Sequence, residues 1–173
     1  MQEDQSSNFS QSALPGDTGV ATSQYFTVGA VKFAVMSLTT CGLYELFWFH
    51  KNWKIIRERD RLDISPFWRA VFAPLWSFSL GERFAKQASA NDVVISLPVV
   101  PLGIMYLVVS ALWRLPEPYW LLSLLSFVPI MPFDFAARGL NGNGQLAEPL
   151  YGRYSGWNIA WLILGTLLLG LIV

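Results

Sequence analysis

The sequence has very few of the residues from which disulfides, metal sites and nucleic-acid contacts are built. It contains one cysteine and one histidine, and its 12 basic residues are balanced by 12 acidic residues. A single cysteine excludes an intrachain disulfide framework and a cysteine metal site, and a net charge of zero gives no sign of nucleic-acid binding. Charged residues make up only 14% of the chain, well below the roughly 25% of soluble domains.

The chain also lacks the short motifs that carry familiar chemistry. It has no GxSxG, HExxH or P-loop pattern, and the glycines at residues 142 and 144 do not follow a strand as those of a dinucleotide-binding loop do. The N-terminus is acidic and polar, without the basic region of a signal peptide. We therefore expect no catalytic residues, no cofactor and no metal, and hence a protein that is not an enzyme.

Hydrophobic residues are abundant, at 53%, and they are gathered in runs. Because about 20 apolar residues in a helix cover the roughly 30 Å hydrocarbon core of a bilayer, the runs predict an all-α integral membrane protein. We expect a disordered polar tail over residues 1–26 and a single transmembrane helical domain over residues 27–173. Four transmembrane helices are expected, at about residues 28–50, 93–113, 119–136 and 157–173.

Residues 66–89 are the ambiguous segment. The uncharged stretch between Arg69 and Glu82 has only 12 residues, too few to cross a bilayer. If the segment stays on the inner face, almost all lysines and arginines become cytoplasmic, as the positive-inside rule requires. We therefore expect an interfacial or re-entrant amphipathic helix here, with a five-span topology as the alternative.

The first predicted span ends in aromatic residues and then in basic ones, between Phe47 and Arg61. The order of membrane, interface and cytoplasm places the N-terminus outside. Lys51, Lys54 and Arg57 are candidate contacts for anionic lipid headgroups.

Two neighbouring runs carry a family resemblance: LTTCGLYELFWFHKNWKIIRERD and DISPFWRAVFAPLWSFSL. They resemble a family of small bacterial membrane proteins of unknown function with an LTxGLYxxxWFxKNW segment, often followed by ISPFWRAxFAP. The late run YSGWNIAWLILG is similar to the final helix of the same proteins. The resemblance covers most of residues 30–90 and 154–170 and implies the inner membrane of a bacterium. It brings no activity and no site residue.

Glu45 is an unexpected residue within the first predicted span, because inserting a charged group at the middle of a membrane helix costs roughly 3 kcal/mol. Helical spacing places it on a stripe of mainly small and polar residues suited to helix packing: Ala30, Ala34, Ser37, Cys41, Glu45, Trp48 and Asn52. Two interpretations stay open. Glu45 is a proton, cation or partner site, or it pairs with Arg69 or Arg83 and fixes residues 66–89 against the first span.

Three further residues are candidates of a weaker kind. Asp134 and Arg138 are four residues apart and predict an ion pair along the third helix, with a gating or substrate role as the alternative. His50, at the predicted membrane boundary, is interpreted as an interfacial anchor or a pH sensor.

Together these features predict a small, non-catalytic protein of the bacterial inner membrane. We expect an accessory or scaffold subunit that packs against lipid, against itself as a homo-oligomer, or against a larger membrane protein. The alternative is a small transporter or channel subunit that uses Glu45 and Asp134 in an oligomeric pore.

Overall fold

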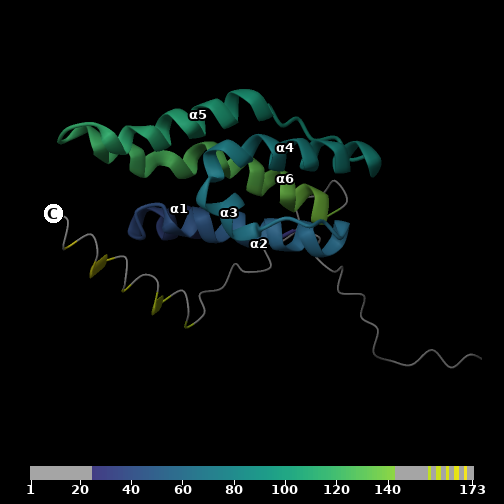
Figure 1. Cartoon of the computed structure of the whole chain (residues 1–173), viewed down its shortest axis with the longest axis horizontal. Coiled ribbons are helices and arrows are strands. Elements are labelled where there is room, and N and C mark those ends of the chain that lie inside the picture. The colour runs from purple at the N-terminus through teal and green to yellow at the C-terminus, as the bar shows by residue number, and fades with distance from the viewer. Residues whose placement is uncertain are drawn as a thin grey trace, which may run out of the picture.

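The computed structural model describes residues 25–142 and single helical positions between residues 156 and 170. Every regular element within residues 25–142 is a helix, which confirms the predicted all-α class in its general form. The α-helices and the two 3₁₀ helices (η) are α1 (Ala30–Thr39), α2 (Leu43–Asp60), α3 (Pro66–Val71), α4 (Ala73–Ala90), α5 (Val99–Ala111), η1 (Leu112–Arg114), η2 (Tyr119–Ile130) and α6 (Met131–Asn141) (Figure 1). The predicted tail up to residue 24 and most of the predicted span over 157–173 lie outside the described residues.

The prediction of one continuous helix over residues 28–50 is wrong, because the chain reverses at residues 40–42. Cys41 and Gly42 have φ angles of 50° and 85°, in the left-handed region that closes a helix. The Gly42 amide donates to the Ser37 carbonyl at 2.9 Å, and the Thr40 hydroxyl accepts the Tyr44 amide at 3.0 Å. The backbone groups freed by the break are thus satisfied locally, and α1 and α2 form a hairpin.

Contacts along the whole hairpin show that its two arms are antiparallel. The rings of Phe33 and Trp48 are 6.0 Å apart near the turn, and Arg59 donates to the Tyr25 hydroxyl at 2.9 Å at the open end. The start of the described chain therefore lies beside the end of α2. A straight first span was the basis for placing the N-terminus outside, and the hairpin removes that basis.

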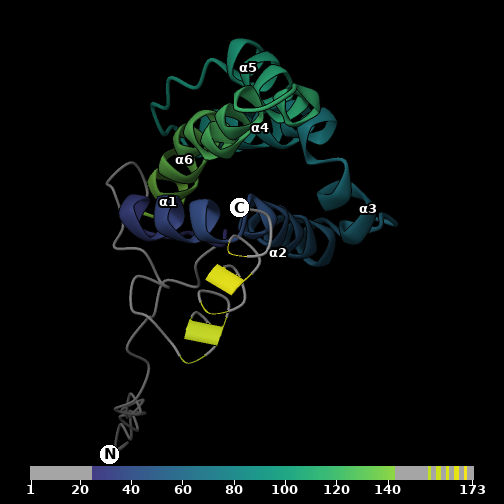
Figure 2. The same ribbon diagram turned by 90° about the vertical axis from the view of Figure 1, so that its left-hand side faces the viewer.

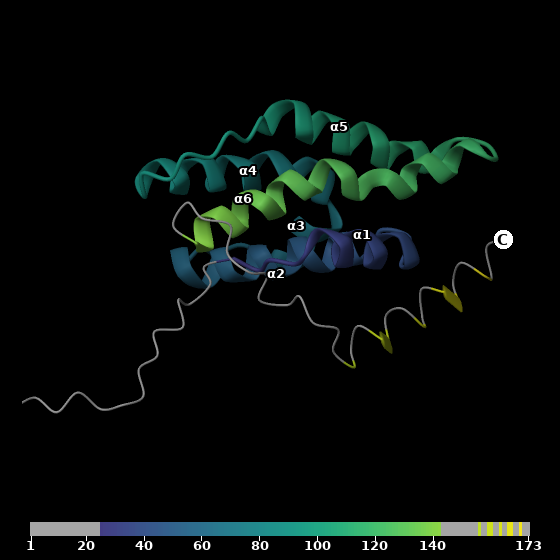
Figure 3. The ribbon, with the colours of Figure 1, turned by 180° about the vertical axis from the view of Figure 1, so that it is seen from behind.

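Residues 25–29 are extended and lie along α2 (Figure 3). Asn52 accepts from the Phe26 amide at 3.0 Å and donates to its carbonyl at 3.1 Å. Asn141 does the same for Tyr25, at 3.0 and 2.9 Å. Both aromatic side chains are buried, so the predicted disordered tail over 1–26 is wrong at its last two residues. Buried extended backbone needs such partners.

The second hairpin runs from α5 and η1 through a turn at residues 114–118 into η2 and α6. It follows the predicted pair of helices, but α5 begins at Val99, after Pro98, rather than at residue 93. The returning arm, Tyr119–Asn141, is continuous over 23 residues. Within the described residues it is the one helix long and apolar enough to cross a membrane, while Ala30–Thr39 and Val99–Arg114 are shorter apolar helices.

The helix expected over residues 66–89 forms as two pieces, α3 and α4, because the chain breaks at Phe72, just before Pro74 at the start of α4. Figure 2 shows α1 and α2 as one layer and α4, α5 and α6 as the other, with α3 at their edge. Gly81 of α4 lets Phe133 and Val99 approach closely. Small residues permit this close packing of helices.

The two hairpins have their turns towards the same end of the molecule, as Figures 1 and 3 show. Ser126, within η2, contacts Glu45 beside the first turn. At the opposite end Tyr25, Arg59 and Gln87 meet. We call this second region the polar end, because the basic and acidic residues of α2 and α4 gather there.

Candidate functional site

The Glu45 carboxylate lies where three helices meet. Its side chain comes from the first turn of α2 and is 2% exposed. The Ser126 hydroxyl of η2 donates to Glu45 Oε1 at 2.7 Å, and the Tyr106 hydroxyl of α5 is a second hydrogen-bond partner. Tyr106 in turn contacts Ser110 through a hydrogen bond. The site is a buried carboxylate held by neutral hydroxyls.

This geometry bears on one of the two interpretations of Glu45, its pairing with an arginine. The predicted pairing with Arg69 or Arg83 is wrong. Arg69 lies over the rings of Trp53 and Trp76, at 4.3 and 4.2 Å, and Arg83 contacts Asp60. Arg83 belongs to the polar end and Arg69 lies beside Trp53 and Trp76, whereas Glu45 lies at the start of α2, near the hairpin turns. The interpretation of Glu45 as a site within the bundle stays a prediction.

Asp134 fastens the second hairpin to the first. Its Oδ1 atom accepts from the Val28 amide at 2.9 Å and from the Trp48 indole at 3.0 Å. Asp134 as a whole residue is 4% exposed. The hydrogen bonds of Asp134 thus lead to the extended segment and to α2, whereas its predicted partner Arg138 lies over the Phe135 ring at 5.8 Å.

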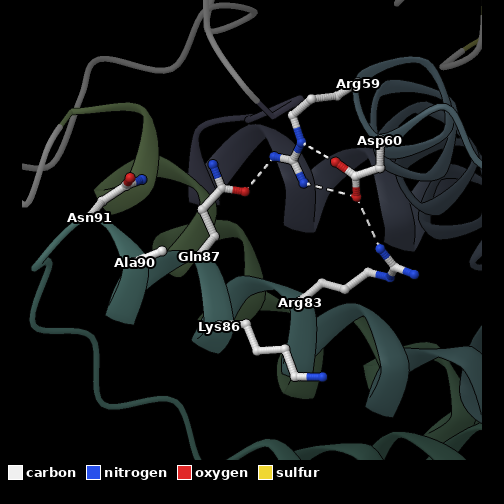
Figure 4. A pocket seen from close by; sticks show the side chains of 7 residues that line it. All are labelled: Arg59, Asp60, Arg83, Lys86, Gln87, Ala90 and Asn91. Atoms are coloured by element: carbon white, nitrogen blue, oxygen red, sulfur yellow. Dashed lines mark hydrogen bonds and ion pairs between the residues drawn. The ribbon is translucent and has the colours of Figure 1, made fainter.

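A hollow of about 340 Å³ opens at the polar end between the last turns of α2 and α4 (Figure 4). Its lining is basic and amidic rather than apolar: Arg59, Asp60, Arg83, Lys86, Gln87, Ala90 and Asn91. Of these residues, the sequence singles out only Arg83, as a possible partner of Glu45, and it does not predict the hollow. The available signal was the helical spacing of Arg83, Gln87 and Asn91, which places them along one face of α4 and its end.

Asp60 is the centre of this polar lining. Arg59 donates through Nε to Asp60 Oδ1 at 2.7 Å, and Arg83 donates to Oδ2 at 3.0 Å. Arg59 also donates to Gln87, as the dashed lines in Figure 4 show, and to Tyr25. One carboxylate therefore positions two guanidinium groups from different helices.

The predicted lipid contacts on α2 lie away from this hollow. Lys54 and Arg57 approach Glu58 at 3.8 and 3.9 Å, and Lys51 lies 5.4 Å from the centre of the Phe47 ring. None of these three basic residues lines the hollow. The structure therefore separates two groups of bases on α2 that the sequence presents as one run.

The charges at the polar end shift the pKa values of their neighbours. The hydrogen bond from Arg59 lowers the pKa of Asp60; burial opposes this effect, while the positive charges of Arg59 and Arg83 add to it. Burial raises the pKa of Tyr25, although its hydrogen bond with Arg59 acts in the opposite direction. Asp60 is therefore ionised at neutral pH, and the Tyr25 phenol is protonated.

The lowered pKa of Asp60 predicts a stability that falls in acid. A group with a lowered folded-state pKa stabilises the fold fully above its ordinary pKa, about 3.9, and loses that contribution as the pH falls through the lowered value. We expect Asp60→Asn to flatten the acid limb of a melting-temperature profile between about pH 5 and pH 2. Asp63→Asn is the matched control, and an equal flattening by both variants would contradict the prediction.

Within the described residues, no three or more His, Cys, Asp or Glu side chains are grouped so that they could hold a metal ion. Cys41 lies half-buried in the first hairpin turn. The described residues therefore offer two candidate sites, the buried Glu45 carboxylate and the hollow at the polar end.

In comparisons with models of protein families, with curated proteins and with solved structures, nothing matches this chain. The resemblance to a family of small bacterial membrane proteins stays a prediction. The class that the described residues define is an all-helical protein with one helix of membrane-spanning length and composition.

Proposed function

We propose that the chain is a non-catalytic protein of a bacterial inner membrane, which inserts through its two hairpins and packs there against lipid and a protein partner. The observation that carries the proposal is the outer surface of the second hairpin. Neither α5 nor η2 contains a charged residue. Their exposed side chains are large and apolar: Val100, Ile104, Met105, Leu107, Val108, Leu121, Leu122, Leu125 and Val128. A contiguous apolar surface of this kind is typical of contact with lipid or with another protein.

The helix lengths support a revised topology. Tyr119–Asn141 has 23 residues, and with rises of about 2.0 Å per residue in η2 and about 1.5 Å in α6 it reaches about 40 Å, enough for a roughly 30 Å core. α1 has 10 residues and reaches only about 15 Å. The other arm of the second hairpin, Val99–Arg114, is a shorter apolar helix that reaches about 24 Å, so a crossing by this arm also uses the residues just before it, 93–98. On this basis we propose that the second hairpin crosses the membrane twice and that the first enters and returns on the same side.

The positions of the bases indicate the direction of insertion. Arg59 and Arg83 lie at the polar end, together with the start of the described chain at Tyr25. Lysines and arginines favour the cytoplasmic side. The proposed orientation therefore places residue 25 in the cytoplasm and the turn at residues 114–118 outside, in place of the expected outside N-terminus.

Cysteine labelling tests this topology directly. In a Cys41→Ser background we expect Glu117→Cys to react with an impermeant maleimide in intact spheroplasts. Ser23→Cys and Ser89→Cys should react only after the membrane is opened. Labelling of Ser23→Cys from outside would restore a first helix that crosses. Release of the protein from membranes by alkaline carbonate would reject the integral location itself.

The accessory role is supported by two surfaces of different chemistry. The second hairpin offers the apolar surface already described, and α3 with the start of α4 exposes Phe67, Trp68, Phe72 and Leu75. Aromatic residues suit the headgroup level of a bilayer. Crosslinking in native membranes should give a defined dimer or a defined complex with another membrane protein. A protein that stays monomeric and uncrosslinked would reject this role.

Glu45 favours a second candidate function, as a subunit of a transporter or channel. Within residues 25–142 the partners of its carboxylate are the hydroxyls of Ser126 and Tyr106, and an ionisable group inside a membrane protein is commonly functional. For this role we expect Glu45→Gln to abolish proton or cation flux into liposomes. Glu82→Gln, at an exposed position on α4, is the control. Flux that Glu45→Gln leaves unchanged would reject the role.

A further inference from the structure

The hollow at the polar end carries more positive than negative charge. Arg59, Arg83 and Lys86 line it together with one carboxylate, that of Asp60. The side chains of Gln87 and Asn91 add amide groups that can donate hydrogen bonds. Three cations against one anion leave a net charge of +2, which favours the binding of an anion.

The two guanidinium groups are held in place while donors remain for a ligand. Arg83 donates to Asp60 through one terminal nitrogen, and a guanidinium has five N–H donors. Arg59 is held by Asp60, Tyr25 and Gln87. Because their positions are already fixed, little side-chain entropy remains to be lost when an anion binds.

Lys86 and Asn91 complete the set of donors. Between residues 25 and 142, neither the Lys86 ammonium nor the Asn91 carboxamide has a hydrogen-bond or ion-pair partner. Figure 4 shows both residues on α4 and its end, with the Lys86 side chain directed away from Arg59 and Asn91 at the other end of the lining from Arg83. Guanidinium, ammonium and amide donors around one space match the acceptor oxygens of a phosphate group.

We propose that this hollow binds a phosphate group, carried by an anionic membrane lipid or by a soluble phosphate ester. Its volume of about 340 Å³ leaves room for more than the phosphate itself. The lipid source rests on the proposed membrane location, because the hollow would then lie at the level of the cytoplasmic headgroups. Neighbouring Trp53 and Trp76, with Arg69 between them, are residues typical of that level.

The test uses the full chain in a neutral detergent, so that it does not depend on membrane insertion. Isothermal titration calorimetry would compare glycerol 3-phosphate, short-chain phosphatidylglycerol and short-chain phosphatidylcholine. We expect Lys86→Gln to weaken binding about fivefold, the effect of one basic residue at an anionic surface. Lys54→Gln makes the same charge change outside the hollow and should leave the affinity unchanged.

The outcomes separate the two sources and the null result. Binding of both glycerol 3-phosphate and phosphatidylglycerol, each weakened by Lys86→Gln, would show that the phosphate ester alone is recognised. Binding of phosphatidylglycerol alone, with the same sensitivity, would identify the lipid. No binding of either ligand, or an equal loss in Lys86→Gln and Lys54→Gln, would overturn the proposal. Carbonate extraction tests the membrane location separately.

Discussion

Asp134→Ala is expected to lower the free energy of unfolding by about 2 to 6 kcal/mol, because two buried donors lose their shared acceptor and each such loss costs about 1 to 3 kcal/mol. The donors are the Val28 amide, at 2.9 Å, and the Trp48 indole, at 3.0 Å. Both residues are fully buried, so water does not replace the carboxylate. Denaturant titration in detergent, followed by tryptophan fluorescence, measures the change.

Two further variants separate the acceptor from the charge. Asp134→Asn keeps an oxygen that can accept both hydrogen bonds and should remain within about 1 kcal/mol of the parent protein. Arg138→Ala tests the helical ion pair that the sequence suggested, and we expect it to cost less than half as much as Asp134→Ala. If Arg138→Ala and Asp134→Ala were equally harmful, the ion pair would be the dominant interaction of this carboxylate.

Gly81→Leu should destabilise the protein by about 3 kcal/mol, at the upper end of the usual cost of overpacking. A Cβ atom at residue 81 would lie 2.7 Å from Cε1 of Phe133 and 2.7 Å from Cγ1 of Val99. Those atoms belong to α6 and α5, so the added side chain would push α4 away from both helices of the second hairpin. Thermal unfolding in detergent, followed by circular dichroism, measures the loss.

Gly156 provides the matched control for this substitution. It is a helical, exposed glycine with nothing within 4 Å of an added Cβ atom. Gly156→Leu should therefore change the melting temperature little, and Gly81→Ala should fall between the two leucine variants. A melting temperature for Gly81→Leu equal to that of Gly156→Leu would contradict the close packing of α4 on the second hairpin.

The sequence predicts the second hairpin better than the first. Two uncharged runs lie on either side of Arg114 and Glu117, and this pattern predicts a pair of helices with a polar turn between them. The run over residues 28–50 has enough apolar residues for a span, but amino-acid composition alone does not predict that the chain reverses its direction within the run. The local signal is Gly42, where a positive φ is allowed without a steric penalty.

The candidate sites show why the remaining contacts escape sequence reasoning. Glu45 and Asp134 could be selected as buried polar groups from their apolar surroundings alone. Their partners are 81 and 86 residues away, at Ser126 and Trp48. If residues 28–50 are predicted to form one straight helix, helical spacing does not place Glu45 beside Ser126 or Asp134 beside Trp48. The hollow around Asp60 is missed for a different reason: the segment between α2 and α4 brings the ends of these two helices together, and helical spacing does not predict that contact.

The pairing of Asn141 with Tyr25 has a consequence for the order of assembly during synthesis. The two residues are separated by 116 positions, which a ribosome needs roughly 6 to 23 seconds to add at about 5 to 20 residues per second. During that interval the first hairpin exists without the carboxylate of Asp134 or the carboxamide of Asn141. The extended segment therefore acquires its full set of partners only when the second hairpin has been made. Residues 25–29 are thus synthesised before the other described residues, but their hydrogen bonds are completed only after α6 has been synthesised.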